Sequence, residues 1–61
     1  MMQPGERKYI GDGVYIYFNG VDFVLYTSDG INETNKIVLE PQVAVYLSIL
    51  IPKTLDNNEV E

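Results

Sequence analysis

The residue types that most often perform nucleophilic, acid–base or metal chemistry are nearly absent from this sequence. The 61 residues include no cysteine and no histidine, which removes thiolates, disulfides, the usual zinc ligands and the commonest general base. The carboxylates that remain as catalytic candidates are Asp12, Asp22, Asp29, Glu33 and Glu40. None has a partner at a helical or strand spacing that would bring two of them into a dry pocket. We therefore expect no enzyme activity, no cofactor and no metal site.

The charge of the chain argues against nucleic acid as a partner. Nine acidic residues against four basic ones give a formal net charge of -5. A groove that follows a phosphate backbone needs clustered positive charge, and the four cations are scattered along the chain. These cations are Arg7, Lys8, Lys36 and Lys53. We therefore expect no direct contact with nucleic acid.

Hydropathy points to a cytoplasmic protein without a membrane anchor. The longest apolar run, 43–51, is interrupted by Ser48 and is far shorter than the roughly 20 residues needed to cross a bilayer. The polar first eight residues lack the apolar stretch of a secretion signal. The sequence thus predicts a small acidic protein that stays in the cytoplasm and does not bind membranes.

Two strand-like runs, 14–18 and 21–27, are separated only by Asn19 and Gly20. Asn-Gly between β-branched and aromatic residues predicts a hairpin with a two-residue type I′ turn. In that register Phe18 lies opposite Val21 and six apolar side chains share one face. We expect this face to form the core, and its members are Val14, Ile16, Phe18, Val21, Phe23 and Leu25.

Turn signals frame this hairpin on both sides. Gly11, Asp12 and Gly13 predict a bulge or tight turn at its start. Residues 28–34, which contain Asp29-Gly30, predict a second turn that leads into a third strand at 36–39.

Glu40 and Pro41 predict the change from strand to helix, because proline suits the first helical position. An apolar stripe then recurs at i, i+3, i+4, i+7 and i+8 and is expected to face the sheet. This helix stripe consists of Val43, Tyr46, Leu47, Leu50 and Ile51. Pro52 is predicted to end the helix, and 56–61 form an acidic tail.

Together these elements predict one α+β domain over 1–61, with an ordered core at about 8–52 and flexible termini. The expected architecture is β-β-β-α, a small antiparallel sheet of three strands, or four, followed by one C-terminal helix. A chain of this size buries only about 60% of the surface of its unfolded form. One short helix covers one face of such a sheet, so the other face is predicted to lack a cover.

The uncovered surface is predicted to be mostly aromatic and β-branched, which is typical of protein contact sites. Its candidate contact residues are Tyr15, Tyr17, Val24, Tyr26 and Val38 on the sheet, with Val45 and Ile49 on the helix. Three interpretations stay open: a tyrosine ladder with hydrated hydroxyls, a self-association surface, or a surface for a different protein. We expect a homodimer or a higher oligomer.

Several short motifs resemble a widespread group of very small, mostly uncharacterised proteins encoded by bacteriophages and prophages. They are the run 8–15 (KYIGDGVY), FNG at 18–20, Thr27 with DGI at 29–31, TNKI at 34–37, and LEP at 39–41 with Val43. Members often carry Asp where Asn19 stands and Glu where Gln42 stands, and they have more charge in the helix. That last departure favours a helix buried by association.

The resemblance implies a setting and no catalytic residues. It implies a small accessory protein made in the cytoplasm of an infected bacterium. By analogy with other small acidic phage proteins, we expect a phage-encoded binding protein that inhibits an anti-phage defence protein by direct contact. Its partners would be itself and a host bacterial protein. The alternatives are a sponge that sequesters a nucleotide immune signal, and a structural or assembly accessory protein of the phage particle.

Overall fold

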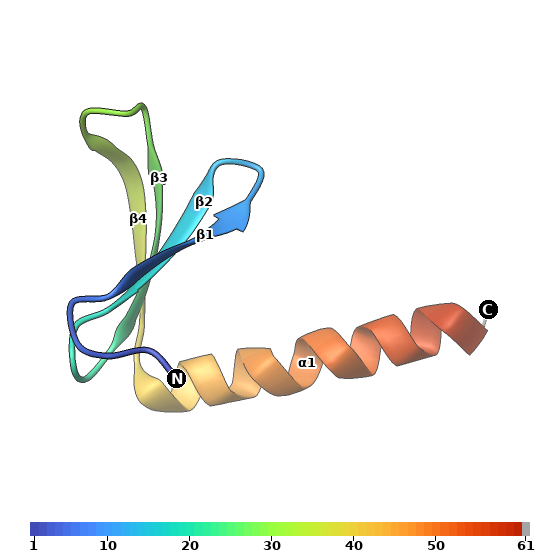
Figure 1. Cartoon of the computed structure of the whole chain (residues 1–61). Coiled ribbons are helices and arrows are strands. Elements are labelled where there is room, and N and C mark those ends of the chain that lie inside the picture. Colours follow the sequence, from blue (N-terminus) through green and yellow to red (C-terminus); the bar gives the residue numbers. More distant parts are fainter. Residues whose placement is uncertain (61) are drawn as a thin grey trace.

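A four-stranded antiparallel sheet followed by one C-terminal helix forms the structure, which is a computed structural model (Figure 1). It describes the backbone of residues 1–60 and the side chains of residues 1–56. The strands follow chain order, β1-β2-β3-β4. Their bounds are β1 Arg7–Gly11, β2 Val14–Phe18, β3 Phe23–Ser28 and β4 Glu33–Leu39, and the helix α1 spans Pro41–Val60. The predicted α+β class is confirmed, with four strands in the sheet.

The glycine-rich turn before β2 contains the predicted irregularity. The pairing of β1 with β2 shifts register between Tyr9 and Gly11, and Asp12 in the turn has a positive φ of 53°. The chain before β1 also bonds to β2, since the Gly5 N–H donates to the Phe18 carbonyl at 2.7 Å. Pairing along β2 therefore continues past the N-terminal end of β1.

The β2–β3 hairpin does not have the predicted two-residue turn. Phe18 pairs with Phe23, and the loop consists of residues 19–22. The Asn19 side-chain oxygen accepts hydrogen bonds from the N–H groups of Val21 and Asp22, at 2.9 and 2.7 Å. The Asn19 N–H in turn donates to the Asp22 carbonyl. This bonding favours the longer loop, so the predicted register is wrong by two residues.

A shift of two residues leaves each side chain within the strands on its predicted face, because side chains alternate with a period of two. Tyr15 still shares a face with Tyr26, and Ile16 shares the opposite face with Leu25. Val21 is the exception, since it lies in the loop and is exposed.

The β3–β4 hairpin uses the same loop device. The Asp29 carboxylate accepts hydrogen bonds from the N–H groups of Ile31 and Asn32, at 2.8 and 2.7 Å, and the Asp29 N–H donates to the Asn32 carbonyl. The sequences N-G-V-D and D-G-I-N thus form equivalent loops at opposite ends of β3. Pairing resumes at Glu33, three residues before the predicted start of the strand.

The buried side chains lie on the face that was expected to be uncovered. Among the described residues, Val24 and Tyr26 are the ones classed as buried, with exposed fractions of 5% and 7%. The face predicted to be the core is lined by half-buried residues such as Ile16 and Leu25. That expectation is wrong, and the position of α1 gives the reason.

Helix α1 does not fold back over the sheet. It leaves the end of β4 and extends away from the strands (Figure 1), and it packs against the sheet mainly through β4. The helix also continues past Pro52 to Val60, so the prediction that Pro52 ends it is wrong. The predicted acidic tail 56–61 is helical over 56–60, and Glu61 lies outside the described residues.

The result is an open shape. The Cα radius of gyration is 13.4 Å, whereas a compact chain of this length would have about 10.5 Å. The longest dimension of the chain is 42 Å, more than the roughly 30 Å length of a helix of 20 residues, because α1 extends outward from the sheet (Figure 1).

Candidate functional site

A ladder of aromatic rings crosses the buried face of the sheet, which we call the tyrosine face and define by Tyr9, Tyr15, Tyr17, Val24, Tyr26 and Val38. The ring centroids of Tyr9 and Tyr15 lie 5.0 Å apart, and those of Tyr15 and Tyr26 lie 5.1 Å apart with an interplanar angle of 11°. Separations of this size are typical of favourable aromatic pairs. The ladder therefore joins β1, β2 and β3 through side chains as well as through backbone hydrogen bonds.

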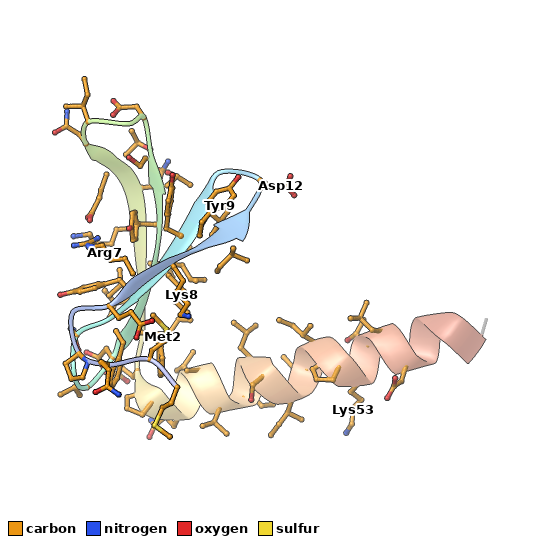
Figure 2. All side chains as sticks on the ribbon, viewed as in Figure 1. Met2, Arg7, Lys8, Tyr9, Asp12 and Lys53 are labelled. Atoms are coloured by element: carbon orange, nitrogen blue, oxygen red, sulfur yellow. The ribbon has the colours of Figure 1, made fainter. Side chains whose placement is uncertain are left out.

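Arg7 covers part of this face. Its side chain extends from β1 toward the β3–β4 hairpin (Figure 2), and its guanidinium carbon lies 4.5 Å from the Tyr17 ring centroid and 5.2 Å from that of Tyr26. Both distances are within the range of cation–π attraction. Arg7 thus supplies cover from within the chain that the sequence analysis did not anticipate.

Glu33 on β4 holds the end of the Arg7 side chain. The Arg7 Nη1 donates to the Glu33 Oε2 at 2.9 Å, and the Lys36 Nζ lies 3.0 Å from Oε1. Lys36 and then Arg7 lower the pKa of the Glu33 carboxyl below its ordinary value of 4.5. The charges on this face are therefore paired among themselves.

The predicted contact residues fall into two groups. Val24 and Tyr26 are buried and Tyr15 and Tyr17 are half-buried, so the expectation of a fully uncovered tyrosine face is wrong. Val38, Val45 and Ile49 are exposed, with exposed fractions of 55%, 58% and 50%. This second group is free to meet a partner without rearrangement of the sheet.

An apolar concavity lies on the opposite face, between the sheet and α1. We call it the groove, and its volume is about 590 Å³. Its lining consists of Ile10, Ile16, Phe23, Leu25 and Leu39 from the sheet, with Pro41, Ala44, Val45, Leu47, Ser48 and Ile51 from the helix. Half of the predicted core residues, Ile16, Phe23 and Leu25, therefore line an open groove.

The groove offers almost nothing to a polar ligand. Ser48 is the one polar side chain in the lining, and its hydroxyl donates to the Val45 carbonyl of its own helix at 2.6 Å. Small-molecule sites usually combine an apolar lining with a few directed polar groups. The groove instead has the character of a surface that takes apolar side chains.

The helix stripe predicted to face the core is exposed as well. Of its residues, Leu47 and Ile51 reach the groove lining, while Val43, Tyr46 and Leu50 lie outside it. The chain therefore carries two uncovered apolar surfaces. One is the groove, and the other is the outer part of α1, which includes Val43, Tyr46 and Leu50.

The sequence did contain a signal for this arrangement. Only Glu40 separates the last residue of β4 from the first residue of α1. A residue before proline is restricted to extended conformations, and proline fixes its own φ. Such a connection leaves the helix little freedom to turn back over the strands.

The described side chains contain no cluster of three or more histidine, cysteine, aspartate or glutamate residues that could hold a metal ion. Within the part of the chain that the structure describes, α1 is not apolar enough over a sufficient length to span a bilayer.

Comparisons with protein-family models, with curated proteins and with solved structures found no match.

Proposed function

We propose that this protein is a binding protein without catalytic activity, which acts as a homo-oligomer and holds another protein through apolar surface that one copy leaves open. One observation carries the proposal. The accessible surface of the chain is 4904 Å², whereas a compact monomer of 6.9 kDa would have about 4,000 Å². The excess of about 900 Å² is close to the roughly 800 Å² that each partner contributes to a standard protein interface.

Large apolar side chains are exposed along much of the chain. Burial of apolar surface contributes roughly 25 cal/mol per Å², and the groove and the outer part of α1 are lined almost entirely by aliphatic and aromatic side chains. A helix without tertiary packing is marginal in water, even at favourable composition. Association with a second molecule supplies the packing that the chain itself does not give.

The proposed setting follows from the resemblance to phage-encoded proteins. In this proposal the protein acts in the cytoplasm of an infected bacterium and inhibits an anti-phage defence protein by direct contact. Val38 and Ile49 remain its candidate contacts, since they are exposed and lie outside the groove, and Val45, which lines the groove, remains a candidate for self-contact. The apolar lining of the groove, with its one self-bonded serine, speaks against a nucleotide sponge.

The test is affinity capture of the tagged chain from infected cells, followed by gel filtration and an activity assay with the purified captured protein. We expect a stable complex that lowers the activity of the captured protein. The double variant Val38→Glu/Ile49→Glu should lose the complex, and the matched control Ile31→Glu, altered at an exposed loop tip, should retain it. Recovery of the chain in purified phage particles, without a host protein, would overturn inhibition in favour of an assembly role.

A further inference from the structure

We infer that the groove of one copy is filled by helix α1 of a second copy, in a reciprocal homodimer. This inference rests on the proposed function and specifies its self-association surface. Within one chain α1 forms one side of the groove, and Val43, Tyr46 and Leu50 of the helix stripe lie outside it. The sheet side of the groove and these stripe residues are the two halves of an ordinary sheet–helix core that does not close within one chain.

The connection between β4 and α1 prevents this core from closing within one chain. Leu39 is the last residue of β4 and Pro41 the first of α1, so the helix direction is set by the restricted backbone of Glu40 and Pro41. The helix then runs outward from the sheet (Figure 1). Short connections of this kind favour exchange of an element between two copies.

The helix stripe has the chemistry that the groove requires. Val43, Tyr46, Leu47 and Leu50 recur at i, i+3, i+4 and i+7, which is the pattern of helices that bind in apolar grooves. None of these residues is charged, and the groove lining is uncharged as well. A helix entering this groove therefore leaves no charge without a partner.

The area agrees with a reciprocal arrangement. A two-fold dimer makes each chain donate one helix and accept another, so that the groove and the helix stripe of both copies are buried together, while Val38 and Ile49 belong to neither surface. The excess of about 900 Å² per chain corresponds to a total near that of a standard interface, roughly 1,600 Å². A free helix of a different protein would fill the groove but would leave α1 itself exposed.

The experiment uses one variant on each of the two surfaces. Ile10→Lys alters the sheet side of the groove, and Tyr46→Asp alters the helix stripe. Both side chains are largely exposed in the single chain, at 58% and 62%, so neither change removes packing within one copy. Circular dichroism of each variant checks that the strands and the helix remain.

Sedimentation equilibrium then gives the oligomeric state of each protein alone and of a 1:1 mixture. We expect each variant alone to dissociate at least about 100-fold more readily than the unaltered protein, because a lone charge enters an apolar contact at both ends of the dimer. In the mixture, one of the two helix–groove contacts contains both altered residues and the other contains neither. The mixture should therefore recover dimer of twice 6.9 kDa. The control Ile31→Lys should remain dimeric.

The other outcomes separate the inference from the proposed function. Dimers that survive both substitutions, or a Tyr46→Asp variant that dissociates while Ile10→Lys does not, would place self-association on another surface and overturn this inference alone. Two variants that stay monomeric when mixed would also overturn it. An unaltered protein that is monomeric throughout would overturn the self-association on which it rests.

Discussion

Arg7 on β1 and Glu33 on β4 form an ion pair across the full width of the sheet, with 2.9 Å between Nη1 and Oε2. Two strands lie between them, and neighbouring strands are about 4.8 Å apart. The guanidinium of Arg7 lies over the rings of Tyr17 and Tyr26, and the Glu33 side chain meets it there. One charged side chain thus ties the two edge strands together and covers the tyrosine face.

Replacing Arg7 by alanine is expected to lower the urea midpoint of unfolding, because it removes both the cation–π contacts and the ion pair. Arg7→Lys should recover only part of the loss, since an ammonium lacks the planar guanidinium that stacks on a ring. The control is Lys8→Ala, which removes only an exposed contact with Glu6 at 3.4 Å. Equal midpoints for Arg7→Ala and Lys8→Ala would contradict the bridging role of Arg7.

Acid is expected to destabilise the fold. The pKa of Glu33 is lowered by Lys36 and then by Arg7, and the pKa of Asp29 is lowered by the N–H groups of Asn32 and Ile31. A carboxyl whose pKa is lower in the folded state contributes stability that is fully present above its unfolded pKa. That stability is lost as the pH falls through the folded pKa.

Urea titrations at a series of pH values check this expectation. The free energy of unfolding should be level at neutral pH and should decrease once the pH falls below the ordinary glutamate value of 4.5. Glu33→Gln should make that decrease smaller, because glutamine has no proton to bind. A decrease of the same size in Glu33→Gln would show that the Arg7–Glu33–Lys36 group does not contribute.

Tyr26 is expected to be among the most costly positions to truncate. It is one of the buried side chains of the described chain and it stacks on Tyr15, so Tyr26→Ala should lower the free energy of unfolding by about 3 kcal/mol. The exposed loop residue Val21 gives the control, with Val21→Ala within about 0.5 kcal/mol of the unaltered protein. Urea unfolding at one fixed protein concentration compares them, because association shifts apparent stability. If Tyr26→Ala and Val21→Ala lowered the free energy of unfolding by similar amounts, burial of Tyr26 on the tyrosine face would be contradicted.

Asn19 is expected to stabilise the β2–β3 loop through its side-chain oxygen. Asn19→Ala removes two hydrogen bonds to backbone N–H groups and should cost about 1 kcal/mol. Asn19→Asp keeps an acceptor and should cost less, as the equivalent Asp29 in the second loop indicates. Asn32→Ala serves as the control. Asn32 accepts the loop hydrogen bond through its backbone carbonyl, so alanine at this position keeps that bond. An Asn19→Ala variant as stable as Asn32→Ala would contradict this role.

The strand pattern was predictable because it depends on local chemistry. Alternation of side chains assigned Tyr15 and Tyr26 to one face and Ile16 and Leu25 to the other, and the structure keeps this assignment. The register was not predictable from Asn19-Gly20 alone. The same dipeptide serves a two-residue turn or the longer loop, and the hydrogen bonds of the Asn19 side chain favour the longer one.

The candidate surface could be predicted only in part, because it depends on the direction in which α1 extends from the end of β4. The sequence identified an excess of apolar residues, and Val45 and Ile49 are exposed as expected. It assigned the wrong sheet face to the open surface, since a stripe such as Val43 and Tyr46 does not reveal whether its partner sheet belongs to the same chain. Nor did it predict that Arg7 would lie over the tyrosine face, because that contact depends on the positions of the edge strands β1 and β4 in the sheet.

Sedimentation equilibrium of the unaltered protein over a range of micromolar concentrations shows whether a second molecule covers the groove and α1. We expect a species of twice 6.9 kDa that dissociates only on dilution. A single 6.9 kDa species at every concentration would contradict this expectation.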